Sequence, residues 1–257
     1  MNRSLPLWQK HRKRLAALLA SAAGLAVCLL CALPQTAVAS AAQRDLPIYC
    51  VQKDSRVCSL TFDAAWGNED TGQLIEILGK YDIKATFFVV GAWAEKFPES
   101  VRALHEAGHE VMNHSDTHPH FTQLSADQMR AQLEACNDKV EAITGVRPEL
   151  FRPPYGDYND QVVATARACG MYAIQWDVDS LDWKNPTPEE ICQRVLERVQ
   201  PGSILLFHNA AENTPAALPG VIEGLLRQGY TMVPVSQLIL REDYTMDHTG
   251  RQVPAGR

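Results

Sequence analysis

Acidic and imidazole side chains recur in this chain directly after short apolar segments. Asp63 and His208 each end such a segment, and His114 and His118 follow a third one with a spacing of four residues. Carboxylates and imidazoles can act as general bases and acids near neutral pH. Neutral imidazoles also bind divalent transition metals. These residue types therefore indicate acid–base chemistry or metal-assisted hydrolysis.

Two further segments of the same kind carry an arginine and a second acidic residue. Arg152 and Tyr155 lie in Arg-Pro-Pro-Tyr-Gly, and Asp182 and Trp183 end Asp-Ser-Leu-Asp-Trp. Each residue alone has an ordinary structural explanation, since an aspartate after a strand often caps a helix and Arg-Pro-Pro can form a turn. Polar side chains at five successive segment ends would contribute little to the packing of an apolar core. We therefore expect them to share one site.

The elements that must position these residues are apolar segments that alternate with amphipathic ones. We expect strands at residues 57–62, 85–90, 110–113, 150–151, 171–176, 203–207 and 231–233, and helices at 68–80, 98–107, 125–144, 160–169, 188–199, 215–227 and 235–240. This alternation predicts an α/β fold in which helical crossovers join parallel strands and functional residues gather at the strands' carboxyl ends. About seven units in roughly 190 residues are short for a regular eightfold barrel. We predict a distorted, incomplete (β/α) barrel with about seven parallel strands.

The five segments resemble, in order, the motifs of the polysaccharide deacetylases, the NodB-homology domain of carbohydrate esterase family 4. The resemblance covers about residues 57 to 240 and is carried by Thr61-Phe62-Asp63, His114-Ser115-x-x-His118, Arg152-Pro153-Pro154-Tyr155-Gly156, Asp179-Ser180-Leu181-Asp182-Trp183 and Leu205-Leu206-Phe207-His208. Residues 65–71 resemble the sporulation-associated branch of that family. The resemblance implies metal-assisted hydrolysis of an N-acetyl, sometimes O-acetyl, group on a sugar polymer.

The resemblance also implies a role for each matching residue. His114 and His118 would hold a divalent metal, with zinc as the expected ion. Asp63 would be the general base and His208 the general acid, and Arg152 would hold the base with a fork capable of bidentate contact. The backbone N–H of Tyr155 would stabilise the oxyanion, and Asp182 would orient the general acid. Trp183 and Leu206 would form walls of the substrate groove.

One position departs from the family pattern. The family's first motif reads Thr-Phe-Asp-Asp-Gly, and its second aspartate is the third metal ligand, but this chain has Ala64 there. Alanine cannot bind a metal, so we expect weaker metal affinity unless Glu69 or Asp70 supplies a carboxylate. Both acids have a competing interpretation as residues that favour the N-terminus of the following helix.

These observations support one leading hypothesis and two alternatives. We expect metal-assisted deacetylation of an N-acetylglucosamine-containing cell-wall polysaccharide, with peptidoglycan as the expected polymer. One alternative is a catalytically silent wall-binding or assembly protein that has lost the third metal ligand. The other is an esterase for O-acetyl groups on polysaccharides. We expect a monomer whose partner is its polysaccharide substrate.

The N-terminal segment has the features of an export signal. Basic residues at 10–14 precede 19 uncharged residues at 15–33, a length that can span a bilayer. Ala37-Val38-Ala39 then forms a small-x-small cleavage pattern. Residues 1–41 can be a cleaved signal peptide or an uncleaved signal-anchor that ties the protein to the membrane. In either case the domain at 57–240 is expected to lie outside the cytoplasm, at the membrane face or in the cell wall.

The charge distribution argues against a nucleic-acid partner. Residues 1–39 hold five basic residues and no acid, which leaves 19 basic and 30 acidic residues in the other 218. Binding to a phosphate backbone needs clustered Lys and Arg. We therefore expect no nucleic acid to bind this acidic body.

Two further expectations concern the ends of the domain. Cys50 and Cys58 flank a segment that we expect to form a hairpin with its turn near Asp54, where a disulfide is possible and two buried thiols are the alternative. We expect the polar residues 243–257 to form a loose tail.

Overall fold

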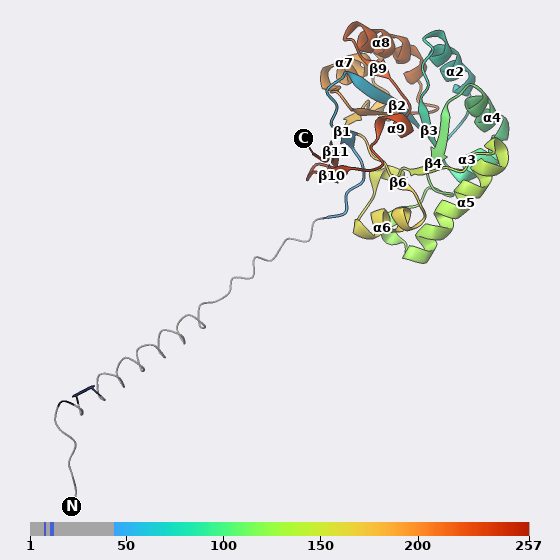
Figure 1. Cartoon of the computed structure of the whole chain (residues 1–257). Helices are drawn as coiled ribbons and strands as arrows, with labels where there is room; N and C mark the ends of the chain where they lie inside the picture. Colours follow the sequence, from blue (N-terminus) through green and yellow to red (C-terminus); the bar gives the residue numbers. More distant parts are fainter. Residues whose placement is uncertain (1–7, 9–10, 13–43, 257) are drawn as a thin grey trace, which may run out of the picture. The chain divides into compact units, whose positions relative to one another are not determined.

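The computed structural model describes Trp8, His11, Arg12 and residues 44–256. The leader predicted at residues 1–41 therefore lies almost wholly outside the described residues, and both interpretations of it remain predictions. No helix in the described part of the chain is long and apolar enough to cross a membrane. The folded unit begins at Arg44 (Figure 1).

A curled parallel sheet forms the centre of this unit, which confirms the distorted, incomplete barrel predicted from the sequence. Its strands follow the spatial order β6-β5-β4-β3-β2-β8-β7, with β9 beside β2, and these pairings are all parallel. The strands are β2 (Val57–Ala64), β3 (Thr86–Val89), β4 (Glu110–Asn113), β5 (Leu150–Phe151), β6 (Tyr172–Ala173), β7 (Val178–Asp179), β8 (Ile204–His208) and β9 (Thr231–Met232).

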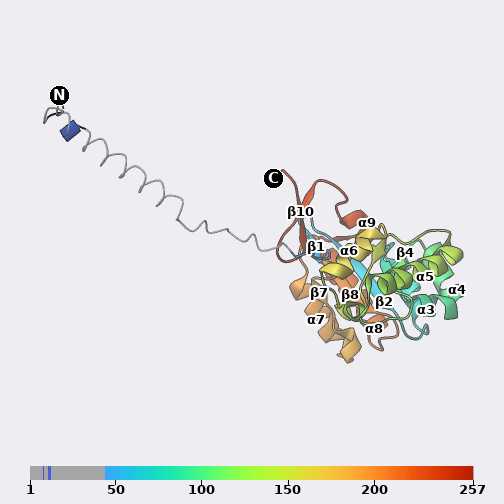
Figure 2. The same ribbon diagram turned by 90° about the horizontal axis from the view of Figure 1, so that it is seen from below.

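Helices surround the sheet in both ribbon views (Figures 1 and 2). Helix α7 packs on α8, and α5 packs on α3, α4 and α6. The helices are α2 (Thr71–Lys80), α3 (Gly91–Lys96), α4 (Pro98–Glu106), α5 (Ala126–Thr144), α6 (Asp160–Ala168), α7 (Pro188–Arg198), α8 (Thr214–Arg227) and α9 (Val235–Leu238). Short 3₁₀ turns form at Phe121–Gln123, Pro154–Gly156 and Asp182–Lys184.

Strand β2 is central because its sequence can be buried on both faces. Every residue from Cys58 to Ala64 is buried, and the strand pairs with β3 on one side and with β8 on the other. Burial on both faces is what a parallel strand covered by helices requires. The register with β8 makes Asp63 and His208 direct neighbours across the two strands.

Helix α5 begins and ends where the sequence predicts. Ser125 Oγ accepts a hydrogen bond from the Gln128 backbone N–H, and the Gln128 side chain accepts one from the Ser125 N–H. This reciprocal capping box fixes the first turn. Gly145 ends the helix in the left-handed conformation, with φ of 73°. The six-residue helix α3 has no counterpart among the predicted elements, because it is too short to show a periodic pattern.

Both expectations at the ends of the domain need correction. Cys50 and Cys58 are not paired across a hairpin: β1 (Cys50–Val51) pairs with β11, and both cysteines are free, buried thiols. Residues 243–256 are not loose, because β10 (Tyr244–Met246) and β11 (Arg251–Pro254) form a second sheet with β1 (Figure 1). Strands β10 and β11 are neighbours in the chain, but β1 and β11 are about 200 residues apart, so no local pattern indicates that pairing.

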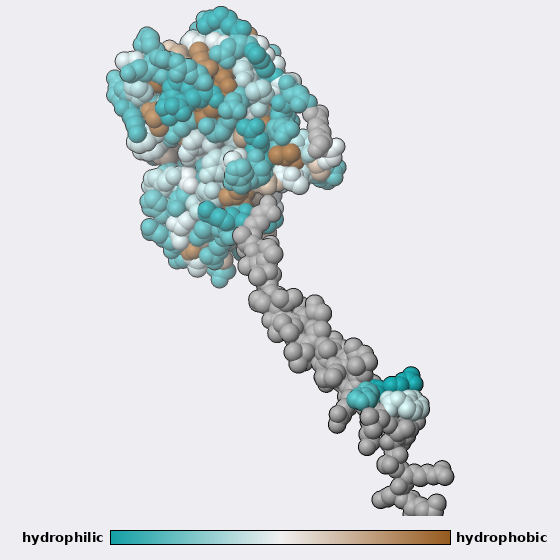
Figure 3. All heavy atoms as spheres, turned by 90° about the vertical axis from the view of Figure 1, so that its left-hand side faces the viewer, coloured by the Kyte–Doolittle hydropathy of each residue, from teal (hydrophilic) through white to brown (hydrophobic). Residues whose placement is uncertain are grey.

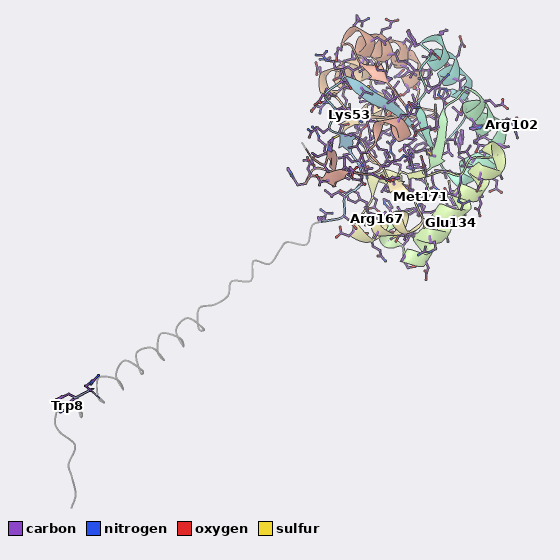
Figure 4. The ribbon with its side chains drawn as sticks, viewed as in Figure 1. Trp8, Lys53, Arg102, Glu134, Arg167 and Met171 are labelled. Carbon is purple, nitrogen blue, oxygen red and sulfur yellow. The ribbon has the colours of Figure 1, made fainter. Side chains whose placement is uncertain are left out.

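Surface charges contribute little to holding this fold together. The face in Figure 3 is mostly hydrophilic, with scattered hydrophobic residues. Arg167 of α6, labelled in Figure 4, donates a hydrogen bond to Asp45 at 2.9 Å. Such exposed ion pairs contribute about 0–1 kcal/mol each. The larger contribution comes from buried side chains such as Phe62, whose ring stacks on Phe87 at 4.8 Å and on Phe207 at 5.5 Å between centroids.

The close contact at Gly202, just before β8, yields a stability test. Gly202 has φ of 88°, and a Cβ atom there would lie 1.7 Å from the carbonyl oxygen of Val51. Gly145 has a similar φ of 73°, with nothing within 4 Å of its Cβ position. We expect Gly145→Ala to lower the free energy of unfolding by about 1 kcal/mol, the cost of a left-handed backbone for an L residue. We expect Gly202→Ala to lower it by at least about 3 kcal/mol, because a backbone oxygen cannot easily move aside. Urea denaturation followed by circular dichroism measures both losses, and equal losses would contradict the clash.

Candidate active site

An open pocket of about 810 Å³ lies at the carboxyl ends of the parallel strands. This volume is within the range of small-molecule and cofactor sites. Arg152 lies beside the pocket and is fully buried. The other eight residues predicted for the site all line the pocket: Asp63, His114, His118, Tyr155, Asp182, Trp183, Leu206 and His208.

Asp63 and Arg152 form a buried ion pair at this pocket. Arg152 Nη1 donates to Asp63 Oδ1 at 2.7 Å, and Asp63 is only 4% exposed. Nη1 also donates to Thr61 Oγ1 at 2.9 Å, and Nη2 donates to the carbonyl of Gln175 at 3.1 Å. Burial is the largest single influence and opposes the charged carboxylate, but the charge and hydrogen bond of Arg152, together with His114 and His208, hold the pKa of Asp63 below its ordinary value. Asp63 is therefore ionised at neutral pH and can accept a proton.

His114 and His118 present ring nitrogens to each other. Their Nε2 atoms are 3.2 Å apart, and His114 Nδ1 lies 2.8 Å from the carbonyl oxygen of Arg152. A carbonyl only accepts hydrogen bonds, so His114 Nδ1 carries the proton and Nε2 keeps its lone pair. Burial lowers the pKa of both rings, that of His118 to about 4. Two neutral imidazoles with converging nitrogens fit as two ligands of a divalent transition metal.

In the described part of the chain, no third side chain completes this pair as a metal ligand. Ala64 is buried and offers only a methyl group. Asp70 Oδ2 accepts a hydrogen bond from the backbone N–H of Ala210 at 2.8 Å, and neither Asp70 nor Glu69 lines the pocket. Within residues 44–256 no three His, Cys, Asp or Glu side chains form a group that could hold a metal ion. Asp70 is the N-cap residue of α2 by position, but its side chain makes no capping hydrogen bond, so the helix-terminus interpretation of the two acids stays a prediction.

His208 is oriented by Asp182. Its Nδ1 lies 2.7 Å from Asp182 Oδ1 and donates to it, because a carboxylate can only accept. Asp182 Oδ2 accepts from the His208 backbone N–H at 2.8 Å and from Thr214 Oγ1 at 2.7 Å. Burial works against the charged imidazole, but the hydrogen bond and charge of Asp182 outweigh it and raise the pKa of His208. A raised pKa is suitable for a group that must hold and then donate a proton.

Backbone strain is concentrated in the loops that carry these residues. Non-glycine residues with φ between 53° and 69° occur in these loops at Ser115, His118, Tyr155, Leu181, Asn185 and Ala210. Each such conformation costs about 1–3 kcal/mol and persists only where its surroundings enforce it. The strain therefore independently indicates a functional region.

Eight of the residues that line the pocket are absent from the predicted set, and two of them, Trp66 and Asn209, belong to or hold the loop after β2. Trp66 lines the pocket and is 55% exposed, and Asn209 holds the loop around it through hydrogen bonds to Ala65 and Gly67. Trp66 lies within the segment at 65–71 that the sequence analysis singled out, so its position was available as a signal. The side-chain contacts of Asn209 span more than 140 residues and leave no sequence pattern.

The fold and the pocket define a class: an incomplete parallel barrel whose strand ends carry an acid–base pair beside paired imidazoles. Residues 51–174 match the family model described as polysaccharide deacetylase. PdaA of Bacillus subtilis, a peptidoglycan-N-acetylmuramic acid deacetylase, is 31% identical over 72% of this chain and 72% of its own length. The chain belongs to the polysaccharide deacetylase family.

Another relative and a solved structure refine this comparison. PdaC of Bacillus subtilis, also a peptidoglycan-N-acetylmuramic acid deacetylase, is 37% identical over 73% of this chain, which spans only 40% of PdaC. BA3943 of Bacillus anthracis is described as a CE4 family pseudoenzyme; its wild-type structure superposes with a TM-score of 0.73 at 39% identity, over 77% of this chain and 70% of BA3943. A BA3943 mutant described as having restored enzymatic activity superposes with a TM-score of 0.72.

The Asp182–His208 contact predicts a specific pH dependence. Because folding raises the pKa of His208, the contact stabilises the fold below the ordinary value of 6.5 and loses that contribution as the pH rises through the folded value. We expect Asp182→Asn to lower the pKa of His208 by at least about one unit and to flatten this part of the stability profile. NMR titration of the imidazole and thermal unfolding against pH measure the two effects.

The matched control for this test is Asp177→Asn. Asp177 is an aspartate on the same segment that accepts hydrogen bonds from Ser203 Oγ and the Ile204 backbone N–H, and among the described residues it makes no hydrogen bond to His208. An Asp182→Asn protein whose His208 titrates like that of the Asp177→Asn protein would disprove the assignment.

Proposed function

We propose that this chain is a metal-assisted deacetylase of an N-acetylglucosamine-containing cell-wall polysaccharide, with peptidoglycan as the first candidate. The observation that carries this proposal is the register of β2 and β8, which sets Asp63 and His208 side by side in one pocket with His114 and His118. An ionised carboxylate beside an imidazole of raised pKa is a suitable base and acid for amide hydrolysis. PdaA and PdaC, which act on peptidoglycan, support the choice of polymer.

The metal would be held by His114 and His118, with zinc as the expected ion. When bound, such an ion polarises the acetyl carbonyl and lowers the pKa of a bound water. Two protein ligands bind a metal less tightly than three, so Ala64 makes us expect weak metal affinity. The Arg152 carbonyl contributes by keeping His114 in the tautomer that can bind.

The chain's own residues supply the proton transfers. Asp63 accepts a proton from the attacking water at Oδ2, since Oδ1 is occupied by Arg152. The backbone N–H of Tyr155 stabilises the negative oxygen that forms when water adds to the acetyl carbonyl. His208 then donates the proton on Nε2 to the departing amine nitrogen, while Nδ1 stays bonded to Asp182. The products are acetate and a free amino sugar.

Further proposals follow from this activity. Trp183 and Leu206 form walls of the groove around the acetyl methyl group. The protein acts outside the cytoplasm, as a monomer, secreted to the wall or held at the membrane if the leader is not cleaved. The relation to sporulation stays a prediction from the segment at 65–71.

Ala64 specifically favours a second candidate function. A protein that retains the groove but lacks the third metal ligand could bind wall glycans without hydrolysing them. The structural similarity to BA3943, a CE4 family pseudoenzyme, supports this candidate. An O-acetyl esterase remains the other alternative, because the same residues could hydrolyse an ester.

Acetate release tests the proposed function. We expect the full-length protein with zinc or cobalt to release acetate from N-acetylchitopentaose or peptidoglycan, and His208→Gln to lower kcat at least about 100-fold, because the amine then leaves without a proton. Asp63→Asn should be equally inactive, but it leaves the buried Arg152 without its counter-charge, at a cost of about 3–5 kcal/mol. Its folding must therefore be verified at the assay temperature.

The outcomes separate the candidates. No acetate from either substrate with either metal would exclude the deacetylase, and retained glycan binding would then support the silent protein. Faster release from O-acetylated than from N-acetylated polysaccharide would establish the esterase instead.

Restoring a carboxylate at position 64 tests the metal site. We expect Ala64→Asp to increase the zinc-induced rise in Tm, because a third ligand tightens binding to the folded state. Without metal, the new carboxylate would repel Asp63 and raise the pKa of one of the two. Ala64→Asn is the matched control, since it adds similar volume without a charge. His118→Ala should abolish the zinc shift in every background. Equal zinc shifts in Ala64→Asp and Ala64→Asn would show that a carboxylate at this position does not reach the metal.

A further inference from the structure

Trp66 occupies a position in the pocket to which none of the roles above is assigned. It lies in the loop after β2, two residues beyond Ala64, and its side chain lines the pocket. Its ring centroid is 6.1 Å from that of His118 and 6.1 Å from that of His208. The indole therefore borders both the imidazole pair and the proposed acid, yet it is 55% exposed.

Hydrogen bonds on both sides hold the backbone around Trp66 in place. The Ala65 backbone N–H donates to Asn209 Oδ1 at 3.1 Å, and Asn209 Nδ2 donates to the carbonyl of Gly67. Trp93 Nε1 also donates to that carbonyl, at 3.0 Å. The exposure of the indole is thus built into a fixed loop and does not come from a loosely held segment.

Trp66 is the middle member of a row of exposed aromatic rings. Tyr155, which follows β5, is 60% exposed, and Trp183, which follows β7, is 57% exposed. Strand β2 lies between β5 and β7 in the sheet. Within residues 44–256, these three are the exposed large aromatic side chains, and all of them line the pocket.

This distribution indicates a ligand with repeated apolar faces. A tryptophan left half exposed forgoes part of its hydrophobic stabilisation, about 25 cal/mol for each Å² not buried. Large exposed apolar side chains gathered at a pocket mark a binding surface. Sugar rings present C–H faces that pack on aromatic faces, while their hydroxyl groups stay free for polar partners such as Asp179 and Glu212, which also line the pocket.

The number of aromatic side chains indicates how long this ligand is. Tyr155 and Trp66 border the same imidazole, with ring centroids 4.5 Å and 6.1 Å from that of His118, and Trp183 follows a third strand. A sugar ring has two faces, so one ring cannot stack on all three side chains at once. A single N-acetyl sugar would therefore leave part of the row uncovered.

We propose that Trp66 is a specificity-determining residue that stacks on a sugar ring next to the reacting one, so that the pocket selects a glycan chain over a short fragment. This inference rests on the proposed function only in taking a glycan as the ligand. A chain laid along the strand ends contacts Tyr155, Trp66 and Trp183 in turn. Trp66 binds it beside the reaction centre, and the imidazoles and Asp63 act on the acetyl group.

Binding of oligosaccharides of two lengths tests the proposal. Full-length wild type, Trp66→Ala and Trp66→Phe are titrated calorimetrically with N-acetylchitopentaose and with N-acetylchitobiose, with a chelator present to prevent turnover. We expect Trp66→Ala to raise the Kd for the pentasaccharide about tenfold and to change that for the disaccharide much less. Trp66→Phe should stay close to wild type, because it keeps an aromatic face. Leu226→Ala, which removes an exposed apolar side chain of α8 outside the pocket, is the matched control and should change neither Kd.

Contrary results are equally clear. An unchanged pentasaccharide Kd in Trp66→Ala, an equal loss for both lengths, or a wild type that binds neither oligosaccharide would overturn the proposal. A change of zinc affinity without a change of glycan affinity would show instead that the indole only shields the imidazoles, and would overturn it as well.

Acetate release separates this inference from the proposed function. A wild type that binds the pentasaccharide through Trp66 but releases no acetate supports the role of Trp66 and refutes the deacetylase. A wild type that releases acetate, with kcat/KM for both lengths unaltered by Trp66→Ala, keeps the deacetylase and refutes the role of Trp66.

Discussion

The rest of the site depends on the buried contact between Asp63 and Arg152. An unpaired charge at either position would cost several kcal/mol, so each residue requires the other. Arg152 also acts through its backbone, because its carbonyl accepts the Nδ1 proton of His114. One residue thus sets both the charge of the proposed base and the tautomer of a proposed metal ligand. Thr61 Oγ1 and the Gln175 carbonyl accept further hydrogen bonds from the guanidinium group and help to keep the arginine in this position.

A second pair, Asp182 and His208, works in the opposite electrostatic direction. The Asp63 carboxylate is kept ionised by a nearby positive charge, while the His208 imidazole gains proton affinity from a nearby negative one. Groups whose environments push their pKa values apart are suited to act as base and acid in one reaction. The parallel register of β2 and β8 places them side by side, and the strained loops around the pocket keep their partners aligned.

The alanine at position 64 is the residue that distinguishes the two proposed functions, which are catalysis and glycan binding without hydrolysis. The imidazole pair, the proposed acid–base pair and the exposed aromatic side chains are all present, so the proposed glycan binding does not require a third metal ligand. The proposed metal affinity does depend on it, since no other carboxylate in the described residues takes its place. A deacetylase with a weak metal site and a silent glycan-binding protein therefore differ in how the metal is held, while the groove serves both.

The sequence by itself determined the elements whose signals are local. Strand β4 and helix α5, with its capping box, lie where apolar runs and capping residues place them, and the order of the motif segments predicted which residues meet in the pocket. Only the tertiary structure decided the features that depend on distant contacts. Cys50 pairs with the strand at Arg251 in place of a hairpin, Asn209 binds the loop that carries Trp66, and the Ala210 N–H binds the Asp70 side chain. The physical reason is that such contacts join residues about 140 to 200 positions apart, and a local pattern of residue types carries no information about which distant partner folding will bring alongside.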